Sequence, residues 1–212
     1  DTPVRLWYTG ITISYPWLTH NRQEAETMHK VFEKIGPENT EETLALALQR
    51  AEELDTDIVV ASSRGDTALK LWEMARQRGF KGKLVDVRLV NSGGKNPMPE
   101  EVAADLRAKG VVLITAAHVL SGAERGISHA HGGIYPVELM ADTLRMISRG
   151  VKVCVEIAVM ALDAGEIPFE KPVVCVGGSG KGADSACVVT PSYAADILKT
   201  RVNEIICKPF NV

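Results

Sequence analysis

The feature that most constrains the fold is an alternation of short β-rich runs with segments of helical periodicity, which begins near residue 31. Strands are predicted at residues 57–61, 83–90, 111–117, 172–178 and 202–209, with 186–190 as a further candidate. Helices are predicted at residues 39–54, 66–79, 98–110 and 135–150. Strands that alternate with helices form a mostly parallel sheet covered on both faces. The chain is therefore predicted to be an α/β protein with three layers, α/β/α.

Local signals place several helix ends. Asn39 is expected to cap the first helix, with Glu42 reaching back from the third position. Pro99 suits the first turn of a helix, and Gly79 suits the residue after its last turn. Residues 151–165 are apolar almost all round, which predicts burial in whichever element they form.

The composition is that of an ordinary globular protein. Of 212 residues, 45% are hydrophobic and 24% are charged, which suits one large domain with a sizeable core. The formal net charge is −3 and no basic block occurs, so nucleic acid is not an expected partner. No apolar run approaches the roughly 18 residues of a membrane span. The first residues lack the pattern of a signal peptide, so we expect a cytoplasmic protein without membrane contact.

The cysteines indicate a reduced interior. All lie in apolar runs and none forms a C-x-x-C pair, so buried thiols are expected instead of disulfides or a structural zinc site. They are Cys154, Cys175, Cys187 and Cys207.

Residues 1–27 do not share the alternation. They contain two of the three tryptophans and show no clear helical period, whereas Met28 opens a segment that reads as a natural beginning. We interpret residues 1–27 as an N-terminal extension without an assigned function and residues 28–212 as a single α/β domain.

A polar turn follows the strand predicted at residues 57–61. Its residues are Ser62, Ser63, Arg64, Gly65, Asp66 and Thr67, and a helix begins within it. One reading is that Ser63 or Asp66 simply caps the helix. The other is that hydroxyls, backbone N–H groups and the helix dipole together bind a phosphate. We favour the phosphate, because one cap needs one side chain and because open α/β sheets bind ligands at the carboxyl ends of their strands.

Several blocks of sequence resemble a known family. Residues 36–73, "GPENTEETLALALQRAEELDTDIVVASSRGDTALKLWE", resemble the C-terminal domain of pyruvate kinase. The match is closer to the stand-alone prokaryotic proteins called pyruvate kinase C-terminal domain-like, and it extends from about Lys30 to Pro209. The further blocks are "TAAHVLSGAERGIS", "VCVEIAVMALDAGEIP", "VCVGGSGKGADSA" and "EIICKP".

The resemblance implies a three-layer fold and a ligand. In pyruvate kinase this domain is regulatory, and the turn that matches Ser62–Thr67 holds a phosphate of a sugar bisphosphate. The stand-alone relatives look like flavin mononucleotide (FMN) binders whose reaction is not established. The catalytic barrel of the kinase has no counterpart in this chain, so pyruvate kinase activity is not implied.

A glycine-rich loop is the second candidate ligand segment. It is part of "VGGSGKGADSA" and contains Gly177, Gly178, Ser179, Gly180, Lys181 and Gly182. A nucleotide triphosphatase P-loop needs a Ser or Thr after its lysine to bind magnesium, but Gly182 follows Lys181 here. The glycines allow close backbone approach by a ligand. The alternative is a flexible strand-end turn without a ligand.

A third segment, residues 116–136, follows a predicted strand and is read as a glycine-rich loop. His118 at the strand end is the candidate proton-transfer group, and Arg125 or Lys181 is expected to place positive charge near a flavin ring. His129 and His131 have no supporting carboxylate cluster, so no metal is expected. Further along the chain, Glu156 is an acidic residue inside an apolar run, where an unpaired charge would be costly.

Three functions are compatible with these motifs. The first is binding of a phosphate-bearing small molecule, FMN above all, with or without oxidoreductase activity. The second is a sensor for a sugar phosphate, and the third is an enzyme acting on a small phosphorylated substrate. For Glu156, two arrangements are open: it faces the pocket, or it pairs with a base such as Arg125. Assembly into a homo-oligomer is a further expectation.

Overall fold

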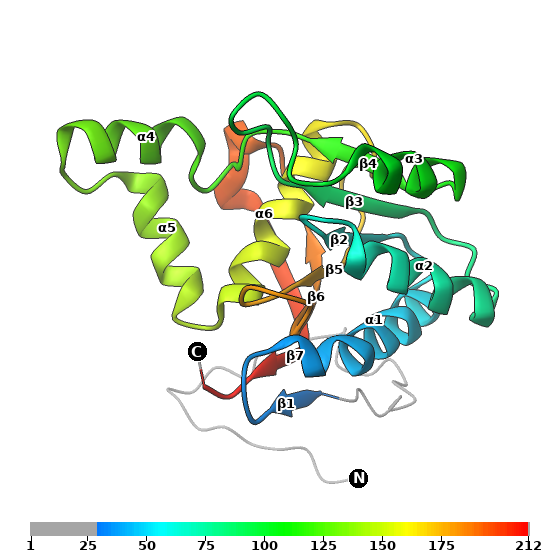
Figure 1. Cartoon of the computed structure of the whole chain (residues 1–212). Coiled ribbons are helices and arrows are strands. Elements are labelled where there is room, and N and C mark those ends of the chain that lie inside the picture. The colour runs from blue at the N-terminus through cyan, green and yellow to red at the C-terminus, as the bar shows by residue number, and fades with distance from the viewer. Residues whose placement is uncertain (1–28, 212) are drawn as a thin grey trace, which may run out of the picture.

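The protein, described by a computed structural model over residues 29–211, is built around one seven-stranded sheet with helices on both faces (Figure 1). The strands are β1 (Lys30–Phe32), β2 (Ile58–Ala61), β3 (Leu84–Arg88), β4 (Val112–Thr115), β5 (Val173–Gly177), β6 (Ser185–Thr190) and β7 (Arg201–Pro209). Their order across the sheet is β1-β7-β6-β5-β2-β3-β4. The predicted three-layer α/β/α class is confirmed.

Most helices agree with the pattern read from the sequence, but the helix predicted at residues 135–150 ends at Arg145, and residues 149–150 belong to the following helix. The helices are α1 (Thr40–Leu54), α2 (Asp66–Arg78), α3 (Glu100–Ala108), α4 (Gly122–His131), α5 (Pro136–Arg145) and α6 (Arg149–Asp163), with short 3₁₀ turns η2 (Pro37–Asn39) and η3 (Ala194–Lys199). The apolar segment 151–165 forms most of α6, and nearly all of its side chains are buried. Helices α4 and α5 stand to one side of the sheet in Figure 1.

The sheet is mostly parallel. β2 pairs in parallel with β3 and with β5, and β3 pairs in parallel with β4. β6 is antiparallel to both β5 and β7, while β1 pairs in parallel with β7. The carboxyl ends of β5, β2, β3 and β4 therefore lie along one edge.

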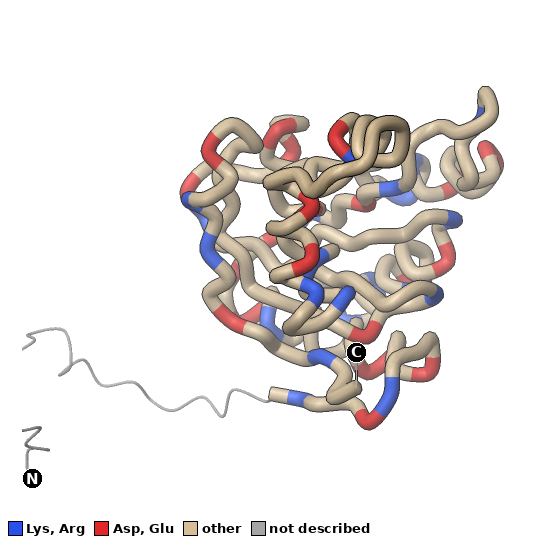
Figure 2. The backbone as a smooth tube through the Cα atoms, turned by 90° about the vertical axis from the view of Figure 1, so that its left-hand side faces the viewer, with Lys and Arg blue, Asp and Glu red and all other residues tan. Residues whose placement is uncertain are grey.

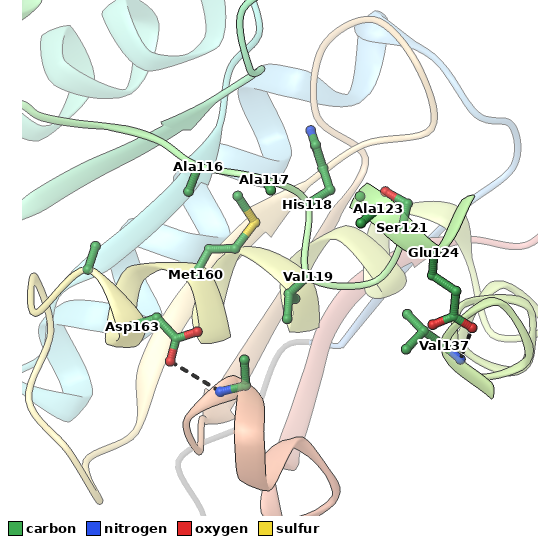
Figure 3. A pocket seen from close by; sticks show the side chains of 13 residues that line it. Ala116, Ala117, His118, Val119, Ser121, Ala123, Glu124, Val137, Met160 and Asp163 are labelled. Carbon is green, nitrogen blue, oxygen red and sulfur yellow. Dashed lines mark hydrogen bonds between the residues drawn. The ribbon is translucent and has the colours of Figure 1, made fainter. Parts of the chain in front are cut away.

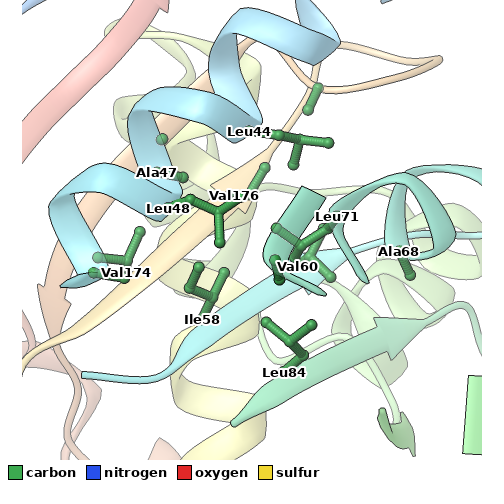
Figure 4. Close-up of a cluster of buried hydrophobic side chains, with 14 of the residues drawn as sticks. Leu44, Ala47, Leu48, Ile58, Val60, Ala68, Leu71, Leu84, Val174 and Val176 are labelled. Carbon is green, nitrogen blue, oxygen red and sulfur yellow. The ribbon is translucent and has the colours of Figure 1, made fainter. Parts of the chain in front are cut away.

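Two hydrophobic clusters hold the layers together, one on each face of the sheet. On the first face, Ile58, Val60 and Val176 of the sheet pack against Leu44 and Leu71 of α1 and α2, as Figure 4 shows. On the second face, α6 covers a separate cluster of alternate strand residues that includes Val59, Val85 and Cys175. This alternation follows from the two-residue period of a strand.

Two local predictions are wrong. The Asn39 side chain donates a hydrogen bond to the Lys34 carbonyl at 2.8 Å and makes no capping bond to α1. The η2 turn directly precedes α1, so Asn39 at the N-cap has helical φ and ψ angles instead of the extended conformation of a capping residue. The second error is the glycine-rich loop at residues 116–136, where residues 122–131 form α4.

The proposed extension, residues 1–27, lies outside the described residues. Across residues 29–211, no helix combines the length and the apolar character needed to cross a bilayer.

Candidate functional site

Two of the three predicted ligand segments follow neighbouring strands. β2 and β5 pair in parallel with Val60 opposite Val176, so the turn after β2 and the glycine-rich loop after β5 begin side by side. α2 leaves β2 along the face that carries α1, whereas α6, which leads into β5, covers the opposite face. The carboxyl ends of parallel strands are where α/β proteins commonly bind ligands.

The turn from Ser62 to Thr67 is held by its neighbours and leaves a helix start open. The Ser62 N–H donates to Asp86 Oδ1 at 3.0 Å, and Gly65 occupies the N-cap of α2 with φ +97°. A Cβ at Gly65 would lie 2.4 Å from Val102 Cγ1, so α3 packs directly against this backbone. The capping alternative is not observed, because neither Ser63 nor Asp66 bonds to the first N–H groups of α2 among the described residues. The side chains of Ser63 and Arg64 are exposed.

Asp86 is an unusual group beneath this turn. It lies in β3 with 0% exposure, and its Oδ2 has no hydrogen-bond partner among the described residues. Burial raises the pKa of Asp86 to about 8, against the smaller lowering effects of the Ser62 N–H and the charge of Arg88. At neutral pH the carboxyl group is therefore mostly protonated and adds little negative charge next to the turn.

The glycine-rich loop is closed by one carboxylate. Asp184 Oδ2 accepts the Ser179 N–H at 3.2 Å, and the Asp184 N–H donates to the Gly177 carbonyl at 3.1 Å. Asp184 is buried, so its role is to shape the loop. A Cβ at Gly178 would lie 2.2 Å from the Gly182 carbonyl oxygen, which explains a glycine at that position. The Ser179 Oγ is buried without a hydrogen-bond partner among the described residues.

His118 belongs to a buried charged cluster. Its Nδ1 lies 3.2 Å from Glu156 Oε2, and Lys152 Nζ donates to the same oxygen at 2.6 Å. Glu156 Oε1 accepts the N–H of Leu120 at 3.0 Å. Burial raises the pKa of Glu156, but the hydrogen bond from His118 and the charge of Lys152 outweigh it and hold that pKa below its usual value. Glu156 thus pairs with bases, as one alternative predicted, but Arg125 is not its partner.

His118 also borders a cavity of about 460 Å³ between the end of β4, α4 and α6 (Figure 3). Two carboxylates border this cavity, and both are engaged by backbone groups. Glu124 Oε1 accepts the N–H of Val137 at 2.9 Å, and Asp163 Oδ1 accepts that of Ala194 at 3.1 Å. The rest of the lining is largely apolar, with Met160 and Val119 in view. Among the described residues, His118 is therefore the titratable side chain of this lining that no backbone group engages, and its role in proton transfer stays a prediction.

A second and larger cavity, of about 690 Å³, brings other predicted residues together. Arg125 lines it together with Gly178, Ser179 and Gly180, although Arg125 lies on α4 and not in a loop. Lys181 and Gly182 are absent from its lining, and Ser62–Thr67 border neither cavity. The predicted residues thus form three neighbouring groups: the β2 turn, the β5 loop with Arg125, and His118 with Glu156.

Sequence reasoning missed several residues near these groups. Arg145, Arg149 and Lys152 all line the larger cavity. Lys152 could have been found from its spacing of four residues before Glu156, which places both side chains on one face of a helix. Asp86 could have been found as an acid inside an apolar strand.

The histidines do not gather around a metal. His129 and His131 lie in the last turn of α4 and are exposed, away from the Glu156 pair of His118. No group of three histidine, cysteine or acidic side chains with metal-binding geometry occurs within residues 29–211.

No protein-family model matches the chain. Its structure is similar to that of pyruvate kinase from Cryptosporidium parvum, solved in complex with ADP, with 14% identity and a TM-score of 0.36. The similarity covers 82% of this chain and 25% of the kinase, so the chain spans only about a quarter of that protein. The finer family assignment and the flavin remain predictions.

Proposed function

We propose that the protein binds a phosphate-bearing small molecule at the carboxyl edge of its sheet, with FMN as the leading candidate. The observation that carries the proposal is the side-by-side start of the Ser62–Thr67 turn and the Gly177–Gly182 loop after the paired strands β2 and β5. The first turn of α2 supplies N–H groups that no side chain caps among the described residues. An anion at this helix start is favoured by those N–H groups and by the helix dipole.

The residues present suit a ligand of this chemistry. The exposed Ser63 and Arg64 can contact a phosphate from the solvent side of the turn. Asp86, which lies on the buried side, is mostly protonated at neutral pH and therefore repels the phosphate little.

FMN is preferred to other phosphate esters on the sequence resemblance alone. When bound, FMN supplies redox chemistry. Lys181 on the exposed side of the loop is the cation we assign to its ring, and His118 is the proposed proton-transfer residue, whereas Arg125 lines a different cavity from His118. A sugar-phosphate sensor and an enzyme for a small phosphorylated substrate use the same phosphate turn, and a colourless preparation would favour either of them.

The test is a visible spectrum of the purified protein followed by titration with FMN. Thr67→Val nearly preserves shape and removes a hydroxyl, and Ser63→Ala removes another. Hydrogen bonds to charged groups contribute about 1.5–3 kcal/mol, so each variant should bind FMN about tenfold more weakly or worse.

Thr190→Val is the matched control, because Thr190 ends the antiparallel strand β6 and so lies at the opposite edge of the sheet. Its affinity for FMN should equal that of the wild type. Unchanged affinity in both Ser63→Ala and Thr67→Val would show that the phosphate does not lie at this turn.

A further inference from the structure

The cavity of about 690 Å³ between α4, α5, α6 and the β5 loop is unusually rich in cations. Four basic side chains line it together with the carboxylates Glu138 and Asp142. The basic residues are Arg125, Arg145, Arg149 and Lys152. The chain as a whole has a formal net charge of −3, and acidic and basic residues are interspersed on the side shown in Figure 2. The cavity lining therefore holds two more basic than acidic side chains.

The carboxylates of this cavity do not neutralise all of its cations. Asp142 forms an ion pair with Arg145, and Glu138 accepts a hydrogen bond from Ser128 Oγ at 2.7 Å. Lys152 is paired with Glu156 beneath the cavity.

Two guanidinium groups remain. Within residues 29–211, neither Arg125 nor Arg149 has a carboxylate within ion-pair distance. Guanidinium groups bind carboxylate and phosphate oxygens in pairs through parallel N–H donors. The cavity thus presents two guanidinium groups, each of which can bind an oxyanion through two parallel N–H donors.

Two further features favour an anion in the same place. The Ser179 Oγ is a buried hydroxyl without a partner among the described residues, and Ser179 lines the cavity. Helix α6 is 15 residues long and begins at Arg149, so the positive end of its dipole lies at the cavity wall. The two features are independent of the arginines, and both attract negative oxygen atoms.

We propose that this cavity is an oxyanion site for a second small molecule that carries a phosphate or carboxylate group. The site is separate from the phosphate turn of the proposed function, because none of the residues from Ser62 to Thr67 lines the cavity. Arg149 and Arg125 bind the oxyanion from the exposed side, and Ser179 donates its hydroxyl from the buried side. The proposal does not depend on FMN.

The test is calorimetric titration with inorganic pyrophosphate and, separately, with malonate. Both are run in the Thr67→Val background, which weakens the competing phosphate turn. We expect at least one probe to bind, and the tighter one identifies phosphate or carboxylate as the preferred group. Arg149→Gln should weaken that binding about tenfold, because it removes a charge-assisted pair of hydrogen bonds.

Arg107→Gln is the charge-matched control, since Arg107 is exposed on α3 and pairs only with the exposed Glu100. It should leave probe binding unchanged. Ser179→Ala should also weaken binding without lowering the melting temperature of the free protein, because the lost hydroxyl has no partner there.

Three results would overturn the proposal. One is that neither probe binds at millimolar concentration, and another is that Arg149→Gln binds as tightly as its parent. The third is an equal loss of FMN affinity and probe affinity in Arg149→Gln, which would make the cavity part of the FMN site. Failure of FMN to bind the wild type would contradict the proposed function and leave the probe titrations interpretable.

Discussion

The buried carboxylate of Asp86 accepts the backbone N–H of Ser62 at 3.0 Å. This bond joins the first residue of the Ser62–Thr67 turn to the neighbouring strand β3 and fixes where the turn leaves the sheet. The other oxygen of Asp86 has no partner among the described residues. The protein therefore replaces only part of the hydrogen bonding to water that this carboxyl group loses when it is buried. The same group that positions the turn should therefore make stability depend on pH.

Asp86→Asn should remove that dependence. Because burial raises the folded pKa to about 8, above an unfolded value of about 3.9, the stabilising effect of protonated Asp86 is complete below about pH 4 and is lost as pH rises toward 8. The loss amounts to about 1.4 kcal/mol per pH unit within that window.

Urea unfolding at pH 5 and pH 8 measures the effect. Asparagine keeps an oxygen for the Ser62 N–H but carries no titrating proton. The free energy of unfolding of the wild type should fall from pH 5 to pH 8, whereas that of the variant should not, so the variant becomes more stable relative to the wild type as pH rises. If the free energies of unfolding of Asp86→Asn and the wild type differ by the same amount at pH 5 and at pH 8, Asp86 is not the titrating group.

Glu156→Gln should destabilise the protein by about 3–5 kcal/mol at pH 7, because it leaves the buried Lys152 without its counter-charge. The folded pKa of Glu156 is lowered, so its contribution is present above the unfolded value of about 4.3 and is lost as pH falls through the folded pKa. The difference from the wild type should therefore shrink in acid, which urea unfolding at pH 7 and pH 3 would measure.

The double variant Lys152→Met/Glu156→Gln is the control. It removes both charges and retains an oxygen for the Leu120 N–H, so it should recover part of the stability that Glu156→Gln loses. A double variant less stable than Glu156→Gln would show that the ion pair is not the cause.

Gly65→Ala should destabilise more than Gly79→Ala. Both glycines have positive φ, +97° and +70°, but an added Cβ at Gly65 lies 2.4 Å from Val102 Cγ1, whereas nothing lies within 4 Å at Gly79. We expect about 1 kcal/mol for Gly79→Ala from backbone conformation alone. Thermal unfolding should show a larger loss at Gly65 that Val102→Ala partly restores, and equal losses would argue against the close contact with α3.

The thiols should react slowly in the native state. All four cysteines are buried, and burial raises the pKa of Cys154 and Cys175 well above the usual value and that of Cys207 to about 12. Labelling with a thiol reagent at pH 7 should proceed only after denaturation. Rapid modification of two or more cysteines in the folded protein would contradict this.

The sequence by itself determined the fold class and most of the elements. A short apolar run marked β2 as a buried strand, and a helical pattern marked α2. Residues 151–165 were expected to be buried because they are apolar almost all round, but their helical form in α6 was not predicted. Residues such as Ser62 and Gly178 were found as candidates because both follow predicted strands.

Tertiary structure decided which of these candidates meet. The pairing of β2 with β5 places the Ser62 turn beside the Gly178 loop, yet the paired residues Val60 and Val176 lie 116 positions apart in the chain. Arg149 and Arg125 reach one cavity only because α6 and α4 pack near the same loop. Contacts between distant segments depend on sheet order and helix packing, which no local pattern encodes.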